Sequence, residues 1–141
     1  MQDRYLFRGK RIDNGEWVHG YLFDDGFENG RVFIGGIVIE KYNGTACDDW
    51  NVTGINFYEI DPNTICQCTG LKDKNGKLIW ENDVVSYCDC TKEDYVIAWE
   101  QNKACFEYQE YSCSMMNFDE LSGCEVEVIG NIFDNPELLE E

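Results

Sequence analysis

The dipeptide Asn-Gly occurs four times in the 141 residues, and it constrains the fold more than any other feature of the sequence. Both residues tolerate the positive φ that a type I′ turn requires, so the pair is a strong local signal for a β-hairpin. The flanking segments alternate apolar and polar residues, as in 16–23, or are rich in β-branched residues, as in 31–42. We therefore expect a mainly β, antiparallel protein with turns at Asn14-Gly15, Asn29-Gly30, Asn43-Gly44 and Asn75-Gly76.

Two lobes are predicted, because the proline of Asp61-Pro62 ends the strand before it. Residues 1–60 are expected to form an N-terminal β-hairpin lobe. In residues 61–141, a sharp turn that ends in Asp83 is followed by several short strands. This order is typical of a small SH3-like barrel, which removes exposed strand edges by closing on itself. Asn135 and Pro136 are residue types preferred at the start of a helix, so a short C-terminal helix is expected.

The charge of the chain is strongly acidic and unevenly distributed. The formal net charge of −17 argues against binding the backbone of DNA or RNA, and we expect no direct nucleic-acid binding. Residues 1–11 carry four basic residues, Arg8 and Lys10 among them, against one acidic residue, whereas residues 104–141 carry ten acidic residues and no basic one. Lys72, Lys74 and Lys77 form a second basic stretch. These five basic residues are the candidate interaction residues.

The chain contains eight cysteines, whose state depends on the compartment. No run of 18 apolar residues and no apolar signal-peptide core are present, so we expect a cytoplasmic protein without membrane contact and with reduced thiols. In a strand, Cys66 and Cys68 would share one face, as would Cys88 and Cys90, and four thiolates can hold zinc. Zinc sites usually have two to four residues between such cysteines, so we expect free thiols and no metal or other cofactor.

Other chemistry-bearing residues have simpler structural interpretations. His19 has no second histidine to join it in a metal site. Glu81 and Asp83 could bind magnesium or act as an acid–base pair, but carboxylates at a turn commonly bond to nearby backbone, and we favour that role. Aromatic side chains of the second lobe are expected mostly in its core, although SH3-like folds also use such residues to bind peptides: Trp80, Tyr87, Trp99 and Phe106.

Three blocks of the sequence together resemble the YopX family of phage and prophage proteins. The central block consists of 60–65 (IDPNTI), Gln67, 69–77 (TGLKDKNGK), Ile79, Glu81 and 83–85 (DVV). The opening block is 7–10 (FRGK) with Trp17, Val18 and Gly20, and the closing block is 127–139 (EVIGNIFDNPELL). The resemblance spans nearly the whole chain.

The sequence departs from the family pattern at two points. Cys66 and Cys68 flank Gln67, where the family usually has glycine and an aromatic residue. Asn82 replaces a glycine before Asp83, but asparagine also tolerates positive φ. The resemblance implies a β-rich protein with an SH3-type barrel, encoded by a phage or prophage, and it implies no mechanism.

No group of residues forms a recognisable active site, so we favour a non-enzymatic phage or prophage accessory protein in the cytoplasm of the bacterial host. It would be an interaction module that assembles with itself as a homo-oligomer, and with a host or phage protein. One alternative is an acidic decoy that imitates nucleic acid and inhibits a host DNA-binding enzyme. A second alternative is a metal-assisted hydrolase that acts through Glu81 and Asp83.

Overall fold

The computed structural model describes residues 3–42, 49–87, 94–110, 115–117 and 126–140. The chain divides into two compact units. We call Leu6–Ile65 the hairpin unit, and Met1–Tyr5 with Cys66–Glu141 the C-terminal unit. The independence of the two predicted lobes, 1–60 and 61–141, stays a prediction.

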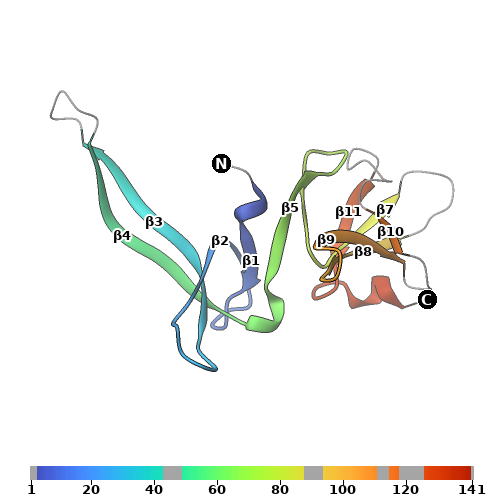
Figure 1. The fold of residues 1–141 in the computed structure, drawn as a ribbon, viewed down its shortest axis with the longest axis horizontal. Coiled ribbons are helices and arrows are strands. Elements are labelled where there is room, and N and C mark those ends of the chain that lie inside the picture. The colour runs from blue at the N-terminus through green and yellow to red at the C-terminus, as the bar shows by residue number, and fades with distance from the viewer. Residues whose placement is uncertain (1–2, 43–48, 88–93, 111–114, 118–125, 141) are drawn as a thin grey trace. The chain divides into compact units, whose positions relative to one another are not determined.

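The hairpin unit is an antiparallel sheet (Figure 1). Its strands, in the spatial order β4-β3-β2-β1, are β1 (Phe7–Lys10), β2 (Trp17–Asp24), β3 (Val32–Tyr42) and β4 (Asp49–Ile60). A 3-10 turn, η2 (Pro62–Thr64), follows β4, and the carboxylate of Asp61 caps it by accepting the N–H of Asn63. Ile34 and Ile60 are fully buried, and Gly9 of β1 lies directly against them.

Three of the four predicted Asn-Gly turns are confirmed, each between two paired strands. One residue of each pair has a positive φ, namely Gly15 (70°), Asn29 (61°) and Gly76 (81°), so none of the three is the type I′ turn, in which both residues do. Asn43-Gly44 lies outside the described residues, although the strands on either side of it pair with each other.

The C-terminal unit begins with a 3-10 turn, η1 (Asp3–Tyr5), and contains the hairpin of β5 (Cys66–Lys72) and β6 (Leu78–Trp80). Five further antiparallel strands form a sheet in the order β10-β9-β8-β7-β11: β7 (Asp83–Tyr87), β8 (Asp94–Glu100), β9 (Cys105–Glu110), β10 (Met115–Asn117) and β11 (Val126–Asn131). Buried side chains from five of the unit's strands form its core: Ile79, Val85, Tyr95, Ile97, Tyr108 and Val126.

The antiparallel β class is confirmed, whereas two finer expectations are not. No pairing joins the end strands β10 and β11 within the described part of the chain, so a closed barrel is not confirmed. The expected C-terminal helix is only a four-residue 3-10 turn, η4 (Pro136–Leu139). Asn135 makes no side-chain cap, because its Oδ1 lies 3.4 Å from the N–H of Asn131 instead. In the regions described, no helix is long and apolar enough to cross a membrane.

Candidate interaction surfaces

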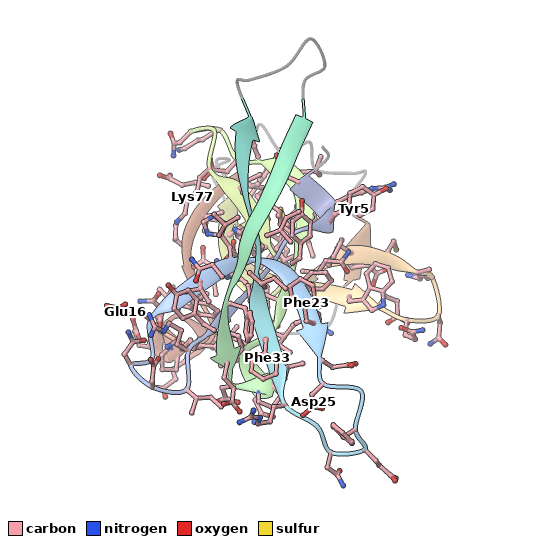
Figure 2. The ribbon with its side chains drawn as sticks, turned by 90° about the vertical axis from the view of Figure 1, so that its left-hand side faces the viewer. Tyr5, Glu16, Phe23, Asp25, Phe33 and Lys77 are labelled. Atoms are coloured by element: carbon pink, nitrogen blue, oxygen red, sulfur yellow. The ribbon has the colours of Figure 1, made fainter. Side chains whose placement is uncertain are left out.

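An apolar groove of about 380 Å³ lies on the hairpin unit, and we call it the aromatic groove. Its lining comes from three strands and the β2–β3 turn: Phe23, Asp24, Arg31, Phe33, Ile55 and Phe57. Phe23 and Phe33 are directly opposed on β2 and β3, and Figure 2 shows them on these adjacent strands. The rings of Phe33 and Phe57 meet edge to face, with centroids 5.3 Å apart. Aromatic rings in this arrangement make a rigid apolar surface, of the kind that binds other proteins.

Charged groups border the aromatic groove without filling it. The guanidinium of Arg31 lies 5.4 Å from the ring centroid of Phe33 and 3.6 Å from a carboxylate oxygen of Glu59. The side chain of Asp25 accepts the N–H groups of Arg31 and Phe27 and so fixes the turn beside the groove. The bond from Arg31 is the main cause that lowers the pKa of Asp25. The border is therefore ordered by local contacts.

A second groove, of about 520 Å³, is lined by Trp17, His19 and Tyr21 of β2 together with residues of β3 and β4. Two of the predicted interaction residues stand beside it. The guanidinium of Arg8 lies 4.8 Å from the Trp17 ring, and the Lys10 ammonium lies 5.4 Å from the same ring. Cation–π contacts of this kind hold basic side chains in place against an aromatic ring.

The other basic stretch surrounds the turn between β5 and β6. Lys74 forms an ion pair of 2.8 Å with Glu127 of β11, and its backbone N–H donates to the carbonyl of Val126. Lys72 and Lys77 are exposed. The structure thus brings Lys74 to an acidic residue of the same chain and leaves Lys72 and Lys77 at the surface.

Asp73 anchors that turn from inside. It is 5% exposed, and its carboxylate accepts three backbone N–H groups: those of Asn75 (2.9 Å), Lys77 (2.9 Å) and Val128 (3.0 Å). Burial by itself would raise the pKa of Asp73, but the three N–H donors outweigh it, and the pKa lies below its usual value. Because Val128 belongs to β11, this residue joins the hairpin tip to the sheet.

Cys66 and Cys68 are both fully buried in β5, on one face of the strand as their spacing predicts. The thiol of Cys68 lies 3.9 Å from the carbonyl oxygen of Ile79, and the side-chain amide of Asn82 lies 3.5 Å from Cys66. Cys88 and Cys90 lie outside the described residues, so the four-cysteine arrangement is not tested. Within the described ranges, no three His, Cys, Asp or Glu side chains are grouped to hold a metal ion.

Glu81 and Asp83 both bond to backbone. Glu81 accepts the N–H of Gln67 at 3.2 Å, and the buried Asp83 accepts the N–H of Trp80 at 2.9 Å. Asn82 between them has a φ of 66°; its N–H donates to Ile97 and its carbonyl accepts from Ile132. These bonds fix the corner between β6 and β7, which supports the structural role favoured for the two carboxylates.

The four aromatic candidates of the second lobe differ in how deeply they are buried. Trp80 is buried, whereas Tyr87 and Phe106 are partly buried against the core of the C-terminal unit. Trp99 is 40% exposed, and its ring meets that of Phe106 edge to face at 5.0 Å. His19 is exposed and lies opposite Arg8 in the β1–β2 ladder.

The patterns considered above predict a strand that ends before Pro62, but they give it neither a start nor an apolar face, and so they do not identify the aromatic groove. Ile55 and Phe57, which complete it, belong to this strand. One signal was available: an Asn-Gly turn after residue 42 requires a second strand downstream, and the apolar residues at 55, 57 and 60 lie where that strand should run.

Comparison with known proteins agrees with this architecture. The crystal structure of protein EF1440 from Enterococcus faecalis is similar, with a TM-score of 0.59 and 26% sequence identity, over 95% of this chain and 96% of that one. No protein with a curated description is significantly similar in sequence. The family model described as YopX protein matches residues 6–140, nearly the whole chain. The chain therefore belongs to the YopX family.

Proposed function

We propose that this chain is a non-enzymatic phage or prophage accessory protein that acts as a self-assembling β-rich interaction module in the cytoplasm of its bacterial host. The aromatic groove is the observation that carries the proposal. Phe23, Ile55 and Phe57 all expose more than two fifths of their surface on one small sheet. The largest contiguous apolar patch on a soluble protein is often functional, and such patches are common sites of protein association.

The basic residues are proposed as the contacts that steer association. Arg8 and Lys10 lie beside the second groove, and Lys72 and Lys77 are exposed on the β5–β6 turn. The acidic residues of 104–141 in another copy, or an acidic host or phage protein, would provide the opposite charge. Such pairs mainly raise the rate of encounter and set the orientation, while the apolar groove supplies affinity.

An SH3-like barrel in the C-terminal unit remains part of this proposal. Four strands, β7 to β10, follow one another in the sheet, and β11 returns to pair with β7. That is the strand order of a five-stranded barrel whose end strands come together. The contacts of Lys74 and Asp73 with β11 support it further, because they place the β5–β6 turn against the end of the sheet.

The hydrolase alternative has less support, since the carboxylates of Glu81 and Asp83 both accept backbone N–H groups. The decoy alternative requires carboxylates at phosphate-like spacing on one surface, and in the sequence the acidic residues are scattered singly and in pairs.

Light scattering on the purified protein at micromolar concentration tests self-assembly. A mass of at least twice 16.4 kDa is expected, and a mass of 16.4 kDa would contradict the proposal. The double variants Arg8→Glu/Lys10→Glu and Lys72→Glu/Lys77→Glu test the steering contacts and serve as controls for each other, because both change the charge equally. Slower assembly with unchanged circular dichroism in one of them identifies the contact. Loss of folding in the first would mean that its basic residues act within the chain.

A further inference from the structure

The β3–β4 hairpin extends beyond the rest of its sheet. β2 pairs with β3 only between Val32 and Gly35, whereas β3 and β4 remain paired as far as Tyr42 and Asp49 (Figure 1). Over residues 36–42 and 49–56 the hairpin therefore has two strands and, within the described residues of its unit, no third strand beside it. A two-stranded antiparallel ribbon is at best marginally stable in water, and a third strand beside it or an element packed on its apolar face adds the missing stability. A ribbon of this length therefore needs a further strand or a covering surface to be stable.

The outer edge of β4 is open for most of its length. β4 is the end strand of the sheet. Among the residues that the structure describes, another segment bonds to that edge only at its last residues, where the N–H of Ile12 donates to Glu59 and Arg11 bridges Ile60. Lysine and proline commonly hinder an edge strand from pairing with another chain, and β4 contains neither. A bulge separates Gly54 from Val52, so the regular open edge is 54–58.

The charge of the ribbon favours a second copy of the same chain. Residues 36–42 and 49–56 carry one lysine, one glutamate and one aspartate, a net charge of −1, in a protein of net charge −17. Two copies of an acidic protein repel each other least where each is nearly neutral. A nucleic acid or a strongly basic partner would find little charge to bind here.

Two exposed apolar side chains lie on the edge strand itself. Ile55 and Phe57 of β4 expose 62% and 49% of their surfaces. At roughly 200 Å² per side chain, they present about 200 Å² of apolar surface next to the edge. That is about a quarter of the roughly 800 Å² that each partner buries in a standard interface. The backbone hydrogen bonds of the edge and the groups around it would supply the remainder.

We propose that the open edge of β4, with the aromatic groove beside it, pairs antiparallel with the same edge of a second copy to form a two-fold symmetric dimer. The proposal rests on the proposed self-assembly and identifies the surface that carries it. Antiparallel pairing of identical edges is self-complementary, as a two-fold axis requires. It would place Ile55 and Phe57 of both copies side by side on one face of a continuous four-stranded sheet, where they can pack against each other across the new pairing.

The variant Ile55→Lys tests this surface, with Ile12→Lys as its matched control. Ile55 is 62% exposed and Ile12 is 59% exposed, and both belong to the hairpin unit, so the two changes have the same chemistry in similar exposure. Light scattering should give at least twice 16.4 kDa for the wild type and for Ile12→Lys, and 16.4 kDa for Ile55→Lys with unchanged circular dichroism. A lysine on each copy would bring two like charges together across the new pairing.

Each other result has a distinct meaning. If Ile55→Lys keeps the wild-type mass, the β4 surface is wrong while self-assembly stands. If the wild type itself is a monomer, self-assembly fails and this dimer fails with it. Should Ile55→Lys not fold, hydrogen exchange of the wild type decides: the amides of 54–58 should exchange more slowly in concentrated than in dilute protein. Exchange that does not depend on concentration would overturn the proposed pairing.

Discussion

Among individual residues, Asp73 stands out because its one carboxylate accepts three backbone N–H groups. Replacing it with alanine would leave the N–H groups of Asn75, Lys77 and Val128 without this acceptor in a mostly buried site. We expect Asp73→Ala to lower the free energy of unfolding by about 2–4 kcal/mol. Asp73→Asn keeps one acceptor oxygen, so its free energy of unfolding should fall by less. Urea denaturation of the three proteins measures both differences, and equal stability of Asp73→Ala and wild type would contradict this role.

The same carboxylate should make stability depend on pH in a defined direction. Its pKa is lowered in the folded protein from a usual value of 3.8, so the folded state binds the proton less readily than the unfolded state does. The stabilisation is complete above pH 3.8 and is lost as the pH falls through the lower, folded pKa. The stability difference between wild type and Asp73→Asn should therefore shrink below about pH 4. A difference that grows on acidification would show that another group dominates.

Asn82 allows the free-energy cost of a left-handed backbone conformation to be measured. Its φ of 66° has a free-energy cost for any residue with a Cβ. Asparagine tolerates this conformation better than most residues, and glycine adopts it without steric cost. We expect Asn82→Ala to be about 1 kcal/mol less stable than Asn82→Gly. Both variants lose the contact with the Cys66 thiol, so their difference isolates the backbone term. Thermal or urea unfolding measures it, and equal stabilities would mean that the corner relaxes.

At the scale of elements, the packing of β1 depends on Gly9. A Cβ at this position would overlap the Cγ2 of Ile60, and it would come within 3.3 Å of Ile34. We expect Gly9→Ala to destabilise the protein by about 1–3 kcal/mol, because both isoleucines are fully buried and have little room to move. Gly54→Ala in β4 is the control, since nothing lies within 4 Å of a Cβ there. The two unfolding curves should separate clearly, with Gly54→Ala close to wild type.

The elements also show which parts of the structure the sequence could predict. Three Asn-Gly turns and the left-handed conformation at Asn82 follow from local backbone chemistry, and local signals sufficed for them. The assignment of Ile55 and Phe57 to a groove depended on the long-range register of β3 with β4, which no local pattern encodes. The C-terminal helix was predicted from its first residues, but the capping side chain of Asn135 faces Asn131. Such competition between two acceptable partners is decided only by the folded structure.

At the scale of the whole molecule, salt should distinguish the two proposed kinds of contact. Pairing along β4 is nearly neutral, and added salt would screen the repulsion between two chains of net charge −17, so dimers should become more stable. Contacts steered by Arg8, Lys10, Lys72 and Lys77 should weaken instead. Sedimentation equilibrium at about 50 mM and 500 mM salt measures the change. Weaker dimerisation at the higher salt concentration would show that charged contacts supply the affinity, and it would contradict pairing along β4 as the main contact.

The order of synthesis gives the division into units a further consequence. Asp3–Tyr5 belongs to the same unit as Cys66–Glu141, and the side-chain amide of Gln67 donates to the carbonyl of Arg4 at 3.1 Å. The ribosome thus makes all of Leu6–Ile65 between two parts of one compact body. Residues 3–5 can make their native contacts only after β5 has been synthesised. The four strands β1 to β4, which are made in between, can pair with one another before that. Folding during translation would therefore begin with Leu6–Ile65 and would reach the N-terminal turn before it late.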